Sequence, residues 1–247
     1  MIANIWAVVP AGGVGARMNA PMAKQYLPLL GQPVMLHTLT RLCALPEVHN
    51  VVVGVADDDV QWQGLGFQHD KLKGVVCAGA QRVDTVLNCL RYIIEQGGSE
   101  DWALVHDAAR PCVRSADIQA LIKTVTDNNE GGILALPVSD TLKRAMLRSG
   151  KTKLEQTDTE KIEQTVSRNG LWRAMTPQLF KVSELKQSIE QAMNKGVLIT
   201  DEASAMEAAG YSPLLIPCSP DNIKITLPED MQFAEMILDR QTQQGIT

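Results

Sequence analysis

The chain has little that would place it in a membrane, in an oxidising compartment or across several domains. No apolar run approaches the ~20 residues that a membrane span needs, and no Pro/Gly/Ser-rich linker divides the 247 residues. The first six residues lack the basic start and the long apolar stretch of a secretory signal. The five cysteines show no paired spacing, so neither a zinc ribbon nor a disulfide framework can be drawn from them. We therefore expect a cytoplasmic protein with reduced thiols.

Positive charge is also in short supply. The net charge is -5 and the pI is about 5.4, so any polyanion must be held by a local cluster of Lys and Arg. We therefore expect neither a nucleic-acid partner nor a membrane partner. The composition, with 45% hydrophobic and 21% charged residues, is that of a folded globular protein.

What the chain does contain is an alternation of short apolar runs and helical patterns. Strands are predicted at residues 7–9, 51–55, 75–77, 102–105, 132–136 and 214–217. Helices are predicted at 34–45, 82–94, 117–126, 183–195 and 202–209, with a last helix that begins at Pro228. This pattern predicts an α/β fold, a single Rossmann-like domain over residues 1–247 with a mostly parallel sheet flanked by helices. Ligands should then bind outside the carboxyl ends of the strands.

The alternation breaks at about residues 141–165, where charged residues are mixed without a clear apolar face. We expect this segment to protrude as a β-arm. Such an arm either packs on a second subunit or is a solvated hairpin that touches nothing.

A glycine-rich loop follows the first strand, from Pro10 through Ala11, Gly12, Gly13 and Gly15, and two cations, Arg17 and Lys24, come after it. Glycines let backbone N–H groups turn toward phosphate oxygens, so the loop is typical of a triphosphate cradle. The dinucleotide fingerprint fails because Met18 stands where a third glycine is needed, and the P-loop fails because Lys24 precedes glutamine. A flexible turn flanked by solvated charges is the structural alternative.

A second loop, His106 to Pro111, follows the predicted strand 102–105 and should share a cleft with the glycine loop. It contains Asp107 and Arg110, although Asp107 could instead cap the turn that follows. His106 is better explained as a packed, hydrogen-bonded residue at the strand end than as a catalyst.

Together these strings, with residues 168–172, 176–178, 200–204 and 221–226, resemble 2-C-methyl-D-erythritol 4-phosphate cytidylyltransferases over essentially the whole chain. The resemblance implies a single nucleotidyltransferase activity, without the cyclase fused to some members, that joins CTP to 2-C-methyl-D-erythritol 4-phosphate and releases pyrophosphate in the non-mevalonate isoprenoid pathway. It also implies a homodimer in which the arm places Arg168 in the partner's site, and Mg²⁺ carried mainly by the CTP phosphates rather than by a protein metal cage.

The resemblance further implies four catalytic cations. Arg17 and Lys24 would stabilise the transition state, and Arg168 and Lys224 would hold the acceptor. Substrate contacts are implied for Pro10, Ala11, Gly12, Gly13, Gly15, Gly79, Ala80, Arg82, Thr85, Asp107, Ala108, Arg110, Thr141 and Thr200. Residues 79–85 would contact cytosine, largely through backbone groups.

Local sequence alone permits simpler interpretations. Arg168 could lie in an exposed turn, Lys224 could face solvent from an alternating strand at 223–226, and Arg82 could be a surface charge at a helix start. Two residues depart from the family pattern. Gly12 replaces an expected alanine, which predicts a looser cradle, and Ala80 stands where an acidic residue is common.

Other functions remain open from the residues. A nucleotidyltransferase for another base or acceptor would need the same loop, and a non-catalytic nucleotide sensor would not need Arg168 and Lys224. A dinucleotide-dependent reductase is disfavoured by Met18.

Overall fold

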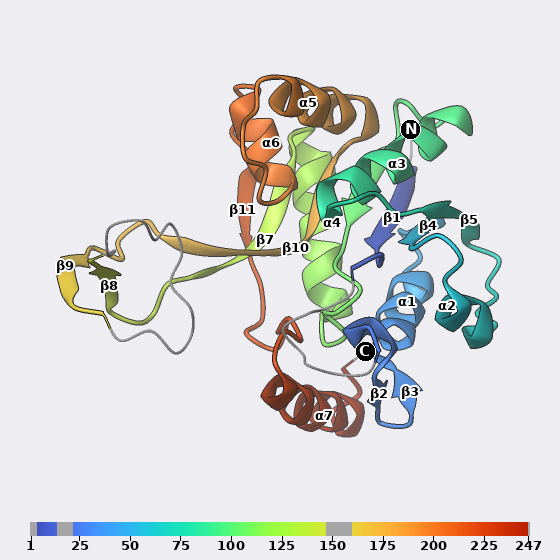
Figure 1. Cartoon of the computed structure of the whole chain (residues 1–247), viewed down its shortest axis with the longest axis horizontal. Coiled ribbons are helices and arrows are strands. Elements are labelled where there is room, and N and C mark those ends of the chain that lie inside the picture. The colour runs from blue at the N-terminus through green and yellow to red at the C-terminus, as the bar shows by residue number, and fades with distance from the viewer. Residues whose placement is uncertain (1–3, 14–21, 147–159, 247) are drawn as a thin grey trace.

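A seven-stranded sheet forms the centre of the protein (Figure 1), in a computed structural model that describes residues 4–13, 22–146 and 160–246. The strand order is β11-β7-β10-β6-β1-β4-β5. The strands are β1 (Ile5–Pro10), β4 (Asn50–Val55), β5 (Leu72–Cys77), β6 (Trp102–Val105), β7 (Gly132–Pro137), β10 (Trp172–Lys181) and β11 (Leu214–Pro217). Neighbours run parallel except at β10, which is antiparallel to β6 and β7. The predicted α/β class with a mostly parallel sheet is confirmed.

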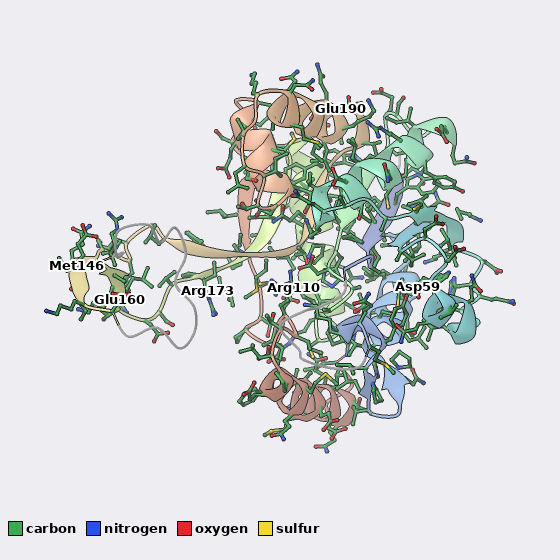
Figure 2. All side chains as sticks on the ribbon, in the orientation of Figure 1. Asp59, Arg110, Met146, Glu160, Arg173 and Glu190 are labelled. Atoms are coloured by element: carbon green, nitrogen blue, oxygen red, sulfur yellow. The ribbon has the colours of Figure 1, made fainter. Side chains whose placement is uncertain are left out.

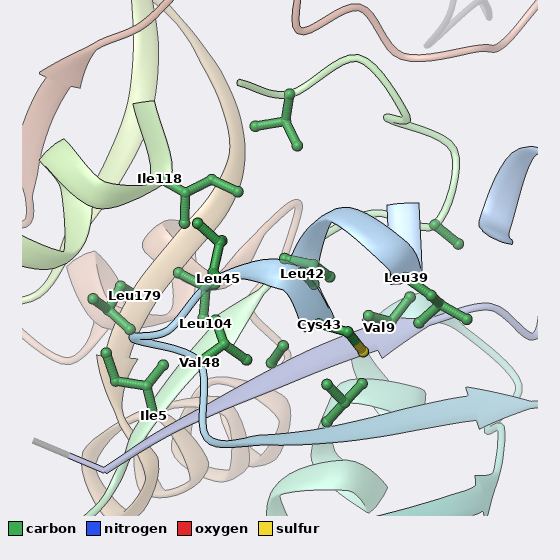
Figure 3. Close-up of a cluster of buried hydrophobic side chains, with 14 of the residues drawn as sticks. Ile5, Val9, Leu39, Leu42, Cys43, Leu45, Val48, Leu104, Ile118 and Leu179 are labelled. Carbon is green, nitrogen blue, oxygen red and sulfur yellow. The ribbon is translucent and has the colours of Figure 1, made fainter. Parts of the chain in front are cut away.

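Helices cover both faces of this sheet. One face carries α1 (Val34–Ala44) and α4 (Ser115–Asn128), and the other carries α3 (Arg82–Glu95), α5 (Val182–Asn194) and α6 (Glu202–Ala208). Strand β1 supplies both cores, because successive side chains of a strand point to opposite faces. Ile5 and Val9 pack with α1 in the first core (Figure 3), whereas Trp6 and Val8 pack with α3 in the second.

A third, smaller apolar cluster joins the last helix to a short hairpin and to the loop after β6. Helix α7 (Pro228–Gln243) contributes Ala234 and Leu238, and they pack with Leu29 of the short hairpin β2 (Pro28–Leu29) and β3 (Gln32–Pro33). Ile225 lies in the same cluster. None of the helices in the described ranges combines the length and hydrophobicity that a bilayer crossing requires.

An arm extends away from the body, as Figure 1 shows. It carries the antiparallel pair β8 (Leu142–Ala145) and β9 (Ile162–Val166), between β7 and β10 in the chain. Apolar side chains are exposed on it, with Ile162 62% and Met146 52% accessible. Met146 and Glu160 lie at the far end of the arm, well away from Arg110 in the body (Figure 2).

Several features differ from the pattern-based expectations. Strand β10 was not predicted, because Pro177 interrupts its pattern, and the structure accommodates the proline at a register shift between Ala174 and Gln178. The six-residue helix α2 (Val60–Leu65) was also missed. The strand expected at 223–226 is wrong: this segment is an extended loop in which the Ile225 N–H donates to the Ala109 carbonyl at 2.9 Å.

Candidate active site

The loops that follow β1, β5 and β6 surround a cavity of about 340 Å³. These three strands are parallel, so their carboxyl ends meet at one edge of the sheet. Twelve residues singled out from the sequence line the cavity: Pro10, Ala11, Gly12, Gly13, Lys24, Gly79, Ala80, Arg82, Thr85, Asp107, Ala108 and Lys224. The structure therefore brings together residues from five separate segments of the chain.

Gln25 holds the glycine loop through hydrogen bonds, although it was not among the site residues predicted from the sequence. Its buried side chain donates from Nε2 to the carbonyl oxygens of Ala11 at 2.6 Å and Gly13 at 3.1 Å. Both carbonyls are thereby directed to Gln25. The short 3-10 turn Lys24–Tyr26 that carries Gln25 is itself anchored, because the Tyr26 hydroxyl donates to Asp59 Oδ2 at 2.7 Å.

Lys24 links the two sides of the cavity. Its Nζ donates to the Ile225 carbonyl at 2.8 Å, so this cation joins the turn after the glycine loop to the segment next to Lys224. The two residues are 201 positions apart in the chain. The sequence indicated the charge of Lys24 but not this contact.

The loop after β5 is held by the first turn of α3. Thr85 is buried, and its hydroxyl accepts the Gly79 N–H at 3.1 Å and lies 3.2 Å from the Gln81 carbonyl. Asp84 Oδ2 accepts the Gln81 N–H at 2.9 Å in a capping box. Thr85 therefore supports the loop backbone, and the backbone of Gly79 and Ala80 lines the cavity.

Asp107 is the centre of the site's electrostatics. Lys224 Nζ lies 2.8 Å from Asp107 Oδ2, Arg82 Nε lies 2.9 Å from Oδ1, and Arg110 Nε lies 3.4 Å from Oδ2. Burial alone raises the pKa of Asp107, but the charges of Arg82, Lys224 and Arg110 outweigh it and hold that pKa well below the usual range. Asp107 is thus a permanent anion that orients three cations.

Glu202 is a second buried carboxylate and was not selected from the sequence. It receives Arg82 in a bidentate pair, with Nη1–Oε1 2.6 Å and Nη2–Oε2 3.2 Å. Glu202 begins α6 directly after the cap Asp201, where a negative charge suits the helix dipole. Burial lowers the pKa of Arg82, but Glu202 and Asp107 raise it beyond its ordinary value. Arg82 consequently joins α3, α6 and the end of β6.

A second cavity of about 290 Å³ adjoins the first and shares Arg82, Asp107 and Lys224 with it. Two further predicted residues, Arg110 and Thr200, line this second cavity. Arg110 is also held by the Asn222 carbonyl, at 2.7 Å from Nη1. Burial lowers the pKa of Arg110, and Asp107 opposes that shift.

His106 lies at the end of β6, fully buried, and lines neither cavity. Its Nε2 lies 3.2 Å from the Arg110 carbonyl and its Nδ1 lies 3.0 Å from Thr176 Oγ1, which accepts the Asp107 N–H. This chain of contacts assigns the ring proton to Nε2, so that Nδ1 accepts from the threonine hydroxyl. Burial lowers the pKa of His106 to about 4. The geometry is that of a packed, neutral strand-end residue.

Four predicted residues remain, and the structure describes two of them, Thr141 and Arg168. Thr141 and Arg168 lie at the arm and line neither cavity of their own chain, and Arg168 Nη1 donates to the Ser139 carbonyl. Within one subunit these two residues therefore lie apart from both cavities. Gly15 and Arg17 lie outside the described residues.

The side chains around the two cavities form no protein metal cage in the part of the chain that the structure describes. Within the described ranges no group of three His, Cys, Asp or Glu side chains is arranged to hold an ion. Asp107 and Glu202 are already engaged by cations. The residues present fit a magnesium ion that enters on a triphosphate, since Mg²⁺ commonly binds through substrate phosphates.

A glycine loop at the carboxyl edge of a mostly parallel sheet, with cations on both sides of the cavity, is the arrangement that a nucleotidyltransferase needs to hold a triphosphate and an attacking phosphate. The family model described as IspD, 2-C-methyl-D-erythritol 4-phosphate cytidylyltransferase, matches residues 5–240. The chain belongs to this family.

Individual relatives agree over nearly their full length. The 2-C-methyl-D-erythritol 4-phosphate cytidylyltransferase of Vibrio vulnificus (strain CMCP6) is 45% identical over 239 residues, 96% of each chain. That of Shewanella amazonensis is 46% identical over 240 residues, 97% of this chain and 95% of the relative. A crystal structure of 4-diphosphocytidyl-2C-methyl-D-erythritol synthase has a TM-score of 0.80 and 35% identity, covering 97% of this chain and 100% of that chain.

Proposed function

We propose that the two adjoining cavities form one active site in which CTP occupies the first and 2-C-methyl-D-erythritol 4-phosphate the second. The family's reaction joins these substrates into 4-diphosphocytidyl-2-C-methyl-D-erythritol and pyrophosphate. The single observation that carries the proposal is that Arg82, Asp107 and Lys224 line both cavities. An acceptor phosphate in one cavity would therefore meet the α-phosphate in the other beside these charges.

On the nucleotide side, the backbone of Gly12 and Gly13 would approach the triphosphate, because no β-carbon stands between it and the ligand. Lys24 supplies positive charge at the same wall, and Arg17 is proposed to add to it. Gly79 and Ala80 would accept the base through their backbone, which Thr85 and Asp84 hold in place.

On the acceptor side, Lys224 is 37% exposed and is the most accessible cation among those that touch Asp107. It is therefore suited to receive a phosphate while Asp107 keeps it in position. Thr200 and Arg110 line the same cavity and are proposed to contact the acceptor. Arg110, held by Asp107 and the Asn222 carbonyl, contributes a fixed positive field there.

The chemistry asks for charge neutralisation rather than proton transfer. A phosphate monoester has a second pKa of ~6 and is largely dianionic at neutral pH, so its oxygen attacks without a general base. A bond forms between that oxygen and the α-phosphorus, and the bond from the α-phosphorus to the bridging oxygen breaks. Pyrophosphate leaves with the electron pair, and the nearby cations stabilise the added charge.

We also propose two partners for this site. Mg²⁺, bound to the triphosphate, would offset its charge and set the geometry of the departing pyrophosphate. A second copy of the chain would form a homodimer through the arm near residues 141–165, with the exposed Ile162 and Met146 in the contact and Thr141 and Arg168 reaching the partner's acceptor cavity.

The direct test is pyrophosphate release by the purified protein supplied with CTP, 2-C-methyl-D-erythritol 4-phosphate and Mg²⁺, with the nucleotide product identified by mass. Replacing CTP by ATP, GTP or UTP at fixed acceptor tests base selection. Turnover that requires CTP and this acceptor supports the proposal. Tight CTP binding without turnover, or preference for another nucleotide, rejects it.

A further inference from the structure

The loops after β1 and β5 meet over the end of the strand that separates them. Strand β4 lies between β1 and β5 in the sheet. The Ala11 N–H donates to the Gly54 carbonyl at 2.6 Å, and the Ala78 N–H donates to the Val55 carbonyl at 2.6 Å. Both loops are therefore hydrogen-bonded to the carboxyl end of β4, and they form adjacent walls of the first cavity.

Gly12 and Ala78 are the point at which these loops touch. A β-carbon placed on Gly12 would overlap the Ala78 β-carbon, well inside the 3.0 Å that real β-carbons keep. The next nearest atoms are the Ala78 Cα at 3.6 Å and the Ala56 N at 3.7 Å, which are ordinary van der Waals distances. The methyl group of Ala78 is thus the only close obstacle within 3.4 Å of that position among the described residues.

Neither loop can move to remove this overlap without losing hydrogen bonds, because side chains hold both backbones in place. Gln25 holds the carbonyls of Ala11 and Gly13 on either side of Gly12. Thr85 holds the Gly79 N–H directly after Ala78. A shift of either backbone would break hydrogen bonds that the buried side chains of Gln25 and Thr85 make. The overlap would therefore destabilise the fold more than it would at a site where a flexible side chain could move aside.

We infer that Gly12 and Ala78 are one size-complementary pair that sets the spacing between the two loops and hence the width of the nucleotide cavity. The inference rests on the proposed role of this cavity as the CTP site. It replaces the expectation that Gly12 in place of alanine loosens the cradle, since the Ala78 methyl fills the space that an alanine at position 12 would take. Ala78 is accordingly a positioning residue, and neither member of the pair can be exchanged alone.

The test is a reciprocal exchange measured in four full-length proteins: wild type, Gly12→Ala, Ala78→Gly and the double variant. Gly12→Ala should raise KM for CTP roughly tenfold, with a smaller change in KM for the acceptor, because overpacking displaces the nucleotide wall. Ala78→Gly should cause a smaller rise. The double variant should return both KM for CTP and Tm most of the way to wild type.

Gly64→Ala is the matched control, since a β-carbon there meets nothing within 4 Å and the residue lies in α2, outside both cavities. If Gly12→Ala is not recovered as folded protein, recovery of the double variant with near-native Tm still supports the pair. An unchanged KM and Tm in Gly12→Ala would overturn it, as would a double variant no better than Gly12→Ala. If the wild type itself lacks turnover, the proposed function fails, while the order of the four Tm values still decides whether the pair exists.

Discussion

Lys24 contacts both halves of the site, being next to Gln25 under the glycine loop and bonded to the Ile225 carbonyl beyond it. Its charge faces the cavity in which the triphosphate is proposed to bind. Negative charge is distributed differently in the bound substrate and in the transition state. A cation in this position is expected to stabilise mainly the charge that develops in the transition state.

Lys24→Ala should therefore lower kcat by about a hundredfold and raise KM for CTP by less than about tenfold. Steady-state pyrophosphate release at varied CTP measures both values. Lys123→Ala removes a lysine from an exposed ion pair on α4 and should leave both unchanged. A raised KM for CTP with kcat unchanged for Lys24→Ala would show that the charge serves binding only.

His106 predicts a pH dependence of stability. Burial lowers its pKa to about 4 from an ordinary value of 6.5, so the unfolded chain binds a proton more readily than the folded one. The stability contributed by neutral His106 is complete above pH 6.5 and is lost as pH falls toward 4. Asp107, whose pKa is also lowered, contributes stability that is lost only at pH values below its ordinary pKa of 3.8.

The free energy of unfolding should therefore fall by about 2 kcal/mol between about pH 7.5 and about pH 5 through His106 alone. Urea unfolding of wild type and His106→Gln at the two pH values isolates this contribution, because glutamine does not titrate. The variant should be less stable at the higher pH and have the shallower pH dependence. Parallel slopes for the two proteins would refute the assignment.

At the scale of elements, the loop between β11 and α7 is fixed by one carboxylate. Asp221 receives Arg114 at 2.6 Å, and also Arg240 and Gln241 from α7. Burial raises the pKa of Asp221, but its bonds to Arg114, Arg240 and Gln241 outweigh this and lower it. The carboxylate thus ties α4 and α7 to the loop that carries Lys224.

Asp221→Asn should destabilise the fold by about 2 kcal/mol, less than a fully buried pair would, because both arginines remain partly solvated. It should also raise KM for the acceptor more than KM for CTP, since Lys224 lies three residues along the loop. Urea unfolding and steady-state kinetics give the two measurements. Asp127→Asn, in an exposed pair, is the control. Loss of stability with both KM values unchanged would separate Asp221 from the acceptor cavity.

For the whole molecule, the arm raises the question of where Arg168 acts. It lines neither cavity of its own chain, whereas Lys24 lines the first. Two inactive subunits, one with Lys24→Ala and one with Arg168→Ala, can therefore be combined to decide between action within a chain and action across a dimer.

If Arg168 acts in the partner's site, a dimer of the two variants contains one complete site and one doubly defective site. Equal mixing by coexpression should then restore about a quarter of wild-type activity, because about half of the dimers are mixed. Size-exclusion chromatography with light scattering confirms the assembly. No recovery of activity from demonstrably mixed dimers would place Arg168 outside the partner's site.

The sequence predicted those features of the structure that depend on neighbouring residues. Alternation of apolar runs and helical patterns predicted the position of β1, β4, β6 and the major helices, and it placed the glycine loop and Asp107 at strand ends. Strand β10 was missed because its proline and polar residues obscure the pattern. The segment 223–226 was predicted as a strand because two isoleucines alternate there with polar residues. In the structure it is an extended loop that hydrogen-bonds to Ala109 and belongs to no sheet.

By itself the sequence determined the element types, the class of fold and the positive charge near the glycine loop, since periodicity and composition act over neighbouring residues. Tertiary structure alone decided the partner of each charge. Glu202 lies 120 positions from Arg82 in the chain and still pairs with it. Lys224 is likewise far from Asp107 in the sequence, although its Nζ lies 2.8 Å from Asp107 Oδ2. Tertiary structure also decided that Gly12 faces Ala78. Such contacts depend on how separately formed elements pack, and no local pattern encodes which distant side chains the packing brings within reach.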